Sequence, residues 1–143
     1  MWTVPAGRMK AGREHRVPLT DRAVEILSGL AETRLGDCVF PGAKRGKPLS
    51  VTSLIMVMRR TGAGDFTVHG FRSAFRDWAG ERTNFPREIA EAALAHVVGD
   101  ATERAYRRGD ALEKRRSLME AWGGFCEGAG GEVVSLARIA TMN

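Results

Sequence analysis

The sequence has little of what membrane, secreted and metal-binding proteins need. No apolar run approaches the roughly 18 to 20 uncharged residues of a membrane-spanning helix, and residues 1–20 carry charges in place of the apolar core of a signal peptide. The only two cysteines, Cys38 and Cys126, stand alone, so the spacing indicates neither a disulfide framework nor a thiolate metal site. We therefore expect a soluble, intracellular protein with reduced thiols and no membrane partner.

Sequence motifs of cofactor-dependent enzymes are missing as well. The three histidines, His15, His69 and His96, are isolated from one another in the sequence. Neither an HExxH motif nor a GxxxxGK[ST] phosphate loop occurs. We therefore expect no metal and no nucleotide cofactor.

Length and charge favour one globular domain with a polyanionic partner. The 143 residues are 43% hydrophobic, which is enough for a buried core, and the formal net charge is +5. The basic surface is mostly N-terminal, because residues 1–60 hold 11 of the 22 Lys and Arg residues but only 5 of the 17 acidic residues. Seven cations lie in two Gly-punctuated stretches that are typical of loops, and they either bind a polyanion or form solvated turns: Arg8, Lys10, Arg13, Arg16, Lys44, Arg45 and Lys47.

The N-terminal third predicts a hairpin followed by a helix. Residues 2–5 and 16–19 have the composition of two short strands, joined by a long basic turn. Thr20 can cap a helix whose apolar residues recur at helical spacing, and Gly36 would end it.

Further helices follow along the chain. Ser50 or Thr52 can start one that ends in two arginines, where cations suit the helix dipole. Residues 70–82 place apolar side chains at steps of three and four, which predicts a strongly amphipathic helix. Pro86 fits the first turn of another helix that reaches about residue 95.

Two D-x-x-E pairs predict the last two helix starts. Asp100 with Glu103, and Asp110 with Glu113, each resemble a capping box with Asp in place of Ser or Thr. The second of these helices should dock firmly through a stripe of apolar residues and end near residues 123–124 or a turn later.

His69 and Arg72 stand three residues apart at the opening of the predicted helix over residues 70–82. Side chains at this spacing share one face of a helix. A helix start bearing His and Arg favours phosphate oxygens, because the helix dipole, the free backbone N–H groups and a bidentate Arg guanidinium all attract them. The alternative is a histidine cap and an arginine on a solvated face.

Tyr106 is the only tyrosine, and cations surround it in the sequence. A phenol becomes a useful nucleophile near neutral pH when positive charge stabilises its oxyanion, and otherwise packs its ring and shows its hydroxyl to water. His96 precedes it by ten residues, so a loop can return it to the tyrosine. Lys10, near the hairpin tip, is either a mobile proton donor, a phosphate contact or a surface lysine.

Taken in order, these segments resemble the catalytic domain of a tyrosine recombinase, specifically of the phage-type integrases found in genomic islands. The resemblance covers about residues 1–126, and its most specific parts are HGFR at 69–72, LAH at 94–96 and AYRR at 105–108. Further matching stretches support it: residues 2–19, 39–41, 46–50, 67–78 and 115–122.

The resemblance implies site-specific recombination, in which DNA is broken and rejoined through a 3′-phosphotyrosyl bond. Tyr106 would attack the phosphodiester and free a 5′-hydroxyl, Arg72 would clamp the non-bridging oxygens, and His69 would assist proton transfer. His96 would hydrogen-bond the phosphate, and Lys10 would protonate the leaving oxygen. No metal or nucleotide is needed, because the covalent bond conserves the energy.

The resemblance also sets expectations for organisation and partners. The family uses an arginine upstream of the hairpin and an N-terminal core-binding domain, and neither has a counterpart here. We expect residues 1–127 to be an α+β, mainly α-helical catalytic domain that is incomplete at its N-terminus, followed by a flexible tail over 128–143, with little recombination by this chain alone. The implied partners are double-stranded DNA attachment sites and other integrase protomers, contacted through the tail, in the bacterial cytoplasm near the nucleoid.

Two other functions remain open from the residues alone. A non-catalytic DNA-binding module would use its Lys and Arg side chains on phosphates while Tyr106 only packs. An unrelated RNA-binding or RNA-cleaving protein would use His69 and Lys10. A Tyr106→Phe comparison separates the first from the recombinase, and labelled RNA would reveal the second.

Overall fold

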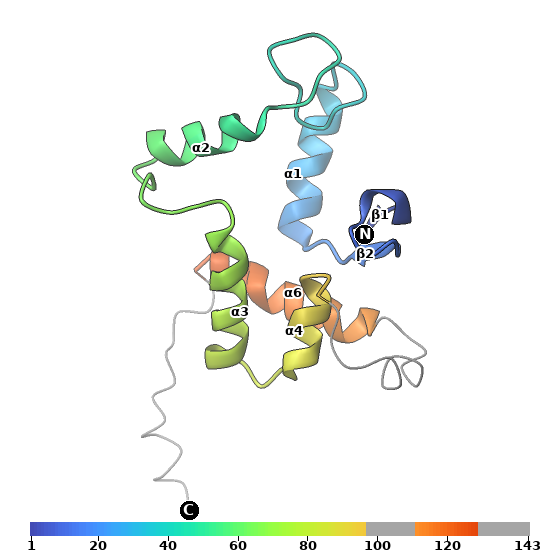
Figure 1. The fold of residues 1–143 in the computed structure, drawn as a ribbon, viewed down its shortest axis with the longest axis vertical. Helices are drawn as coiled ribbons and strands as arrows, with labels where there is room; N and C mark the ends of the chain where they lie inside the picture. The colour runs from blue at the N-terminus through green and yellow to red at the C-terminus, as the bar shows by residue number, and fades with distance from the viewer. Residues whose placement is uncertain (97–110, 129–143) are drawn as a thin grey trace, which may run out of the picture.

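A computed structural model describes residues 1–96 and 111–128 of the chain, drawn in colour in Figure 1. The predicted α+β architecture, mainly helical with a small antiparallel sheet, is confirmed over these residues. The elements in chain order are β1 (Trp2–Val4), the 3-10 helix η1 (Ala6–Arg8), β2 (His15–Val17), α1 (Asp21–Glu32), α2 (Val51–Arg60), α3 (Gly70–Arg82), α4 (Arg87–Ala93) and α6 (Leu112–Cys126).

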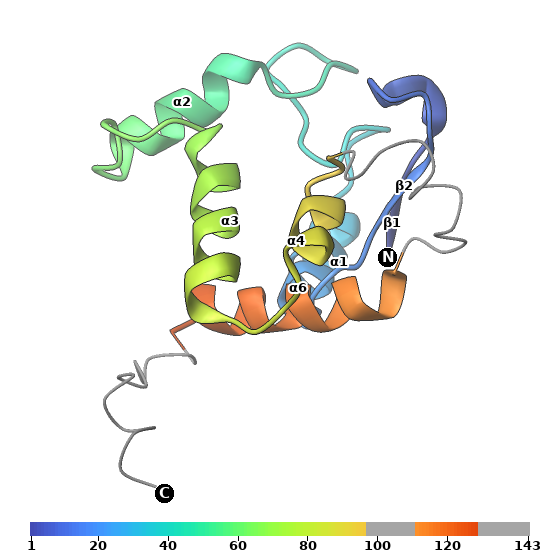
Figure 2. The ribbon, with the colours of Figure 1, turned by 60° about the horizontal axis from the view of Figure 1, so that its bottom comes forward.

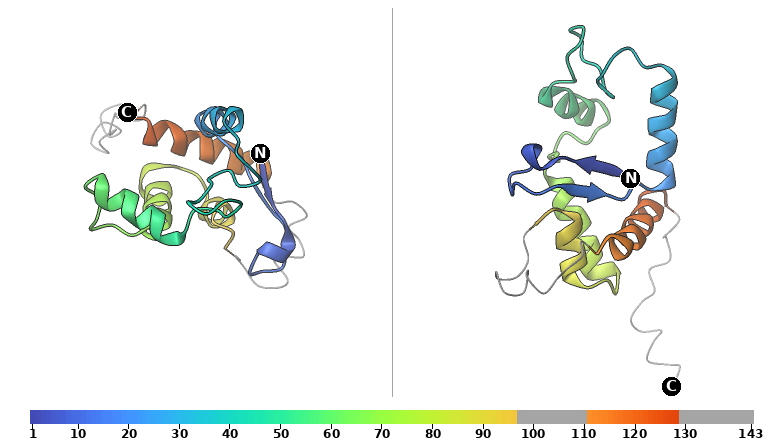
Figure 3. Two further views of the ribbon diagram at one scale, coloured as in Figure 1. Left: turned by 90° about the horizontal axis from the view of Figure 1, so that it is seen from above. Right: turned by 90° about the vertical axis from the view of Figure 1, so that its right-hand side faces the viewer.

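The predicted hairpin forms the N-terminal end of the chain. β1 and β2 pair antiparallel, in a register that sets Thr3 opposite Arg16. The connection ends in a turn, in which the Gly12 amide donates to the Met9 carbonyl at 2.9 Å and Gly12 takes a left-handed φ of +64°. Figure 3 shows this end of the hairpin projecting from the helical body.

The hydrophobic core joins α3, α4 and α6. Its buried residues are Phe75, Trp78, Ala79, Ile89, Ala90 and Leu118. Trp122 of α6 packs against two of the α3 aromatics, with ring centroids 5.4 Å from Phe75 and 5.0 Å from Trp78. Figure 2 shows α3 and α4 side by side on α6, so the amphipathic stripes predicted for α3 and α6 meet in one cluster.

α1 begins where the sequence predicts and ends earlier. The Thr20 side chain caps the helix by accepting a hydrogen bond from the Ala23 amide at 3.2 Å. The helix stops at Thr33, whose hydroxyl donates to the Leu30 carbonyl, three residues before the predicted stop at Gly36. The Thr33 hydroxyl thus satisfies one of the last carbonyls of the helix without a glycine cap.

α2 leaves most of its apolar face uncovered. It follows Ser50, one of the two predicted starts, whose hydroxyl bonds the Ser53 hydroxyl instead of a backbone amide. Met58 is buried, whereas Leu54 and Val57 are about half exposed. Figures 1 and 2 show α2 at the N-terminal end of α3, away from α4 and α6.

α6 starts differently from the predicted capping box. Its N-cap is Ala111, which has a left-handed φ of 50° and no side-chain hydrogen bond, so the helix is capped one residue after the position predicted at Asp110. Asp110 itself, the pair Asp100 and Glu103, and the tail over 129–143 lie outside the described residues. None of the described helices is long and apolar enough to cross a membrane.

Candidate functional site

Arg72 and His96 meet where the start of α3 faces the end of α4. The Arg72 Nη2 atom lies 2.8 Å from His96 Nε2 and donates to the Leu94 carbonyl at 2.6 Å. The same guanidinium nitrogen therefore bridges the C-terminal end of α4 and the histidine that follows it. A cation suits this place, because unpaired carbonyls collect at a helix C-terminus.

The turn after α4 aims His96 at Arg72. The His96 amide donates to the Glu91 carbonyl at 2.9 Å, and the Ala95 amide donates to the Ala92 carbonyl at 3.1 Å. These two bonds make a Schellman motif, and its left-handed position is occupied by Ala95 with a φ of 57°. An alanine holds this conformation at a cost that glycine would avoid.

Glu91 holds His96 in place through a hydrogen bond to its ring. Its side chain is only 10% exposed, and both carboxylate oxygens are occupied. Oε2 lies 2.5 Å from His96 Nδ1, and Oε1 accepts from Arg76 Nε at 2.7 Å. Arg87 Nε stands 3.7 Å from Oε1. The buried acid thus links α4, the turn that carries His96, and α3.

The protonation pattern follows from these contacts. The hydrogen bond from His96 is the largest cause that lowers the pKa of Glu91, and Arg76 lowers it further against the opposing effect of burial. A carboxylate only accepts hydrogen bonds, so the network assigns the neutral ring's proton to His96 Nδ1 and leaves Nε2 to accept from Arg72.

Arg72 retains donors for a ligand. A guanidinium carries five N–H groups, and both of its hydrogen bonds within the described residues use Nη2. Toward the rest of residues 1–96 and 111–128, Nε and Nη1 make no hydrogen bond, and the exposed side chain is held by Leu94 and His96. A fixed guanidinium with free donors is suited to an anionic oxygen.

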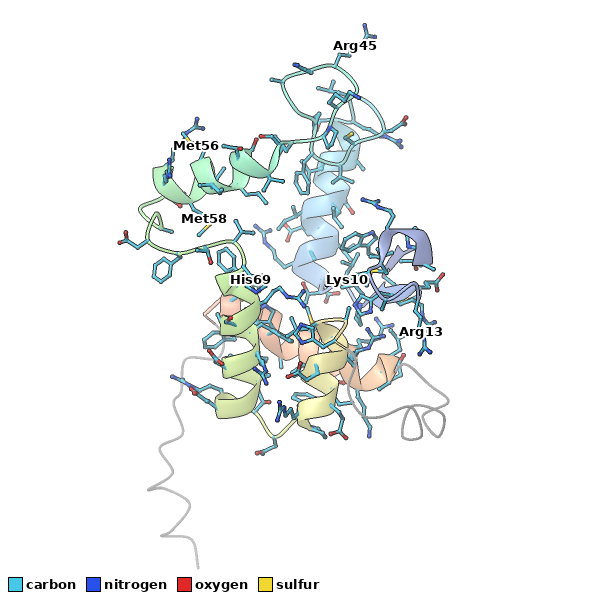
Figure 4. All side chains as sticks on the ribbon, in the orientation of Figure 1. Lys10, Arg13, Arg45, Met56, Met58 and His69 are labelled. Atoms are coloured by element: carbon cyan, nitrogen blue, oxygen red, sulfur yellow. The ribbon has the colours of Figure 1, made fainter. Side chains whose placement is uncertain are left out.

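The structure does not join the other predicted catalytic residues that it describes to Arg72 and His96. His69 occupies the N-cap position of α3 and is exposed, but its side chain makes no capping bond. The Thr67 hydroxyl instead accepts from the Gly70 amide at 3.0 Å. Lys10 is exposed in the hairpin turn (Figure 4). Among the described residues, neither His69 nor Lys10 makes a hydrogen bond or ion pair with Arg72 or His96. Tyr106 lies outside the described residues.

The predicted polyanion contacts lie in two exposed regions. Arg8 and Arg13 are exposed at the hairpin end, whereas Arg16 is half-buried in β2. The second region is a tight loop that is closed by the Gly42 amide donating to the Lys47 carbonyl at 2.7 Å. It displays Lys44, Arg45 and Lys47 to solvent, and Figure 4 shows Arg45 at its outer end.

Two structurally important residues escaped the sequence analysis. Glu91 is five positions before His96, a spacing that matches no shared helix face, and only the Schellman turn folds the two together. Arg115 is 2% exposed on α6 and donates to the Arg16 carbonyl at 2.7 Å. A charged residue at a buried helical position would have been the one available signal.

The curated proteins whose sequences are similar to this chain are named as integrases. The chain is 36% identical to prophage integrase IntA of Escherichia coli K12 over 99% of this chain and 35% of the relative. It is 32% identical to prophage integrase IntS of the same organism and 31% identical to the integrase of Shigella phage Sf6, in each case over 84% of this chain and 32% of the relative.

The chain spans about a third of the length of these curated relatives. No family model and no solved structure matches it. The similarity to the first relative runs through nearly the whole chain, including the segments that form the Arg72 and His96 site. Over the part of the relatives that it spans, the chain belongs to the phage and prophage integrase family.

Proposed function

We propose that this chain is the catalytic part of a tyrosine recombinase, which breaks and rejoins DNA at specific sites. The observation that carries the proposal is the Arg72 and His96 pair, held together at 2.8 Å in a chain whose relatives are named as integrases. The paired side chains present cationic and imidazole nitrogens, as a site for a phosphodiester requires.

The reaction transfers one phosphoryl group and two protons. The Tyr106 oxygen attacks the DNA phosphorus and gives up its proton with help from His69, while the 5′ oxygen leaves and takes a proton from Lys10. Arg72 stabilises the charge on the non-bridging oxygens, and His96 adds a hydrogen bond to them when its Nε2 carries a proton. Attack by a 5′-hydroxyl on the phosphotyrosine reverses the step and joins the strands, so the bond energy is conserved without a cofactor.

The test is a covalent adduct on Tyr106. The chain is incubated with nicked duplexes of randomised sequence, and products are separated on a denaturing gel and examined by mass spectrometry. A second arm places this chain in prophage integrase IntA, in exchange for the third that it matches. We expect an adduct on Tyr106 in the second arm and a weaker one or none from the chain alone.

Tyr106→Phe is the matched control because it removes only the attacking oxygen. It should abolish the adduct and leave DNA binding unchanged. An adduct that persists in the Phe variant would contradict the assigned nucleophile. DNA binding without an adduct in either arm would favour a non-catalytic DNA-binding module.

A further inference from the structure

We infer that Glu91 is a positioning residue, which fixes His96 in its Nδ1-protonated form and thereby holds the Arg72 guanidinium in place. The inference rests on the proposed function for its consequence in DNA cleavage. Its structural part stands on the contacts alone. Glu91 is hydrogen-bonded to His96, and no hydrogen bond or ion pair joins it to Arg72 among the described residues, so it acts on the guanidinium through the imidazole.

The two oxygens of Glu91 have separate tasks. Oε2 accepts a hydrogen bond from His96 Nδ1 at 2.5 Å, and Oε1 accepts one from Arg76 Nε at 2.7 Å. Arg76 lies one helical turn after Arg72 on α3. It pairs with Oε1 of Glu91, so that carboxylate oxygen is not left to pair with Arg72. The Glu91 side chain is only 10% exposed, so these partners take the place of most of its water.

This arrangement keeps the imidazole oriented through a catalytic cycle. His96 Nδ1 keeps its proton and donates it in a hydrogen bond to Glu91 whether Nε2 is free, accepts from Arg72 or carries a proton toward a phosphate oxygen. The ring therefore does not turn when its ligand changes. A ring without Glu91 would have either nitrogen protonated, and the form with a proton on Nε2 cannot accept from Arg72.

A Glu91→Gln variant makes a specific prediction, because an amide has one accepting end and one donating end. Arg76 needs an acceptor, so the amide oxygen turns to Arg76 and the NH₂ group turns to His96. His96 Nδ1 must then accept, which moves the ring proton to Nε2 and removes the bond with Arg72. The substitution should thus invert the tautomer without removing the side chain.

Arg76→Gln separates this role from a structural tie. It removes the Arg76 ion pair and leaves the bond between Glu91 and His96, so the Nδ1 proton should stay. The double variant Glu91→Gln with Arg76→Gln frees the amide oxygen and should restore protonation at Nδ1 in part. If Glu91 had only a structural role, the two single variants would have the same effect on the position of the His96 ring proton.

The measurement is ring ¹⁵N NMR of the histidine-labelled, purified chain near pH 8, with His96 assigned by its loss in His96→Gln. Thermal melting shows that each variant is folded. We expect an Nδ1-protonated ring in the native chain and in Arg76→Gln, and an Nε2-protonated ring in Glu91→Gln. A native ring protonated on Nε2, or an unchanged ring in Glu91→Gln, would overturn the inference.

A second readout connects Glu91 to the reaction. In the IntA exchange protein, Glu91→Gln should slow adduct formation about tenfold to a hundredfold at unchanged DNA affinity, because misorientation of about an ångström has that effect. Glu120→Gln, at an exposed position of α6, is the charge-matched control. Native-like cleavage by Glu91→Gln would refute the positioning role. Absence of cleavage in the unsubstituted protein would count against the proposed function, and the NMR result would still decide the tautomer.

Discussion

The Arg115 guanidinium donates a hydrogen bond at 2.7 Å to the backbone carbonyl of Arg16, 99 residues earlier in the chain. The bond joins β2 to α6, which contributes Leu118 to the hydrophobic core. β2 is one strand of the hairpin whose turn carries Lys10. Arg115 is 2% exposed, so the donor side of this part-buried bond is shielded from solvent. The hairpin therefore depends on a core helix for its position.

Replacement of Arg115 should be costly and replacement of its neighbour should not. Arg115→Met removes a charged donor from its hydrogen bond with the Arg16 carbonyl, and we expect the free energy of unfolding to fall by about 1 to 3 kcal/mol. Arg116→Met removes a surface pair with Glu113 at 3.4 Å and should change it by less than about 0.5 kcal/mol. Urea unfolding of both variants measures the difference, and equal losses would contradict the assignment.

Two adjacent glycines in α6 should respond in opposite directions. A Cβ at Gly123 would lie 2.9 Å from Thr20 Cγ2, and that side chain is held by its capping bond, whereas a Cβ at Gly124 meets nothing within 4 Å. Gly124→Ala should stabilise by up to about 1 kcal/mol through helix propensity. Gly123→Ala should destabilise by about 1 kcal/mol. Thermal melting of the two variants checks this contrast.

The left-handed residue before His96 offers a third prediction. Ala95→Gly should stabilise the chain by about 0.5 to 1 kcal/mol, because glycine adopts a φ of 57° without a Cβ penalty. Ala92→Gly, within α4, should instead destabilise by about that amount. Ala95→Val, which is β-branched, should destabilise and disturb the ring signal of His96. Chemical denaturation with the NMR measurement tests all three, and a destabilising Ala95→Gly would contradict the described turn.

Acid should remove the contribution of Glu91. The folded-state pKa lies below the ordinary value of 4.5, so the folded chain holds this proton less tightly than the unfolded chain. The stabilisation is fully present above pH 4.5 and is lost as the pH falls through the lowered pKa. The difference in unfolding free energy between the native chain and Glu91→Gln should be constant near neutral pH and shrink below about pH 4.5. A pH-independent difference would argue against an ionised, paired Glu91.

The basic loop should set the salt dependence of DNA binding. Each phosphate contact contributes about −0.9 to the slope of log K against log salt, so loss of Lys44, Arg45 and Lys47 together should flatten it by up to about 2.7. The control replaces three cations that have acidic partners: Arg22, Arg34 and Arg116. Fluorescence anisotropy over a salt series compares the two triple Gln variants, and an equal flattening would show that net charge alone matters.

The sequence by itself determined the local elements and the family. Thr20 and the period of the apolar residues place α1 and α3, because caps and periodicity act over a few residues. The strand-like composition of residues 2–5 and 16–19 places the hairpin. The HGFR and LAH stretches carried the resemblance that the integrase relatives bear out.

Only the tertiary structure decided which side chains meet. Arg72, Glu91 and His96 come together because packing between α3 and α4 sets the start of one helix beside the end of the other, and a left-handed Ala95 turns the chain back. Such contacts depend on the complementary shapes of two apolar faces, which no local pattern encodes. The apolar stripe of α2 shows the same limit, because its spacing predicts a helix and the arrangement of the described residues leaves that face exposed.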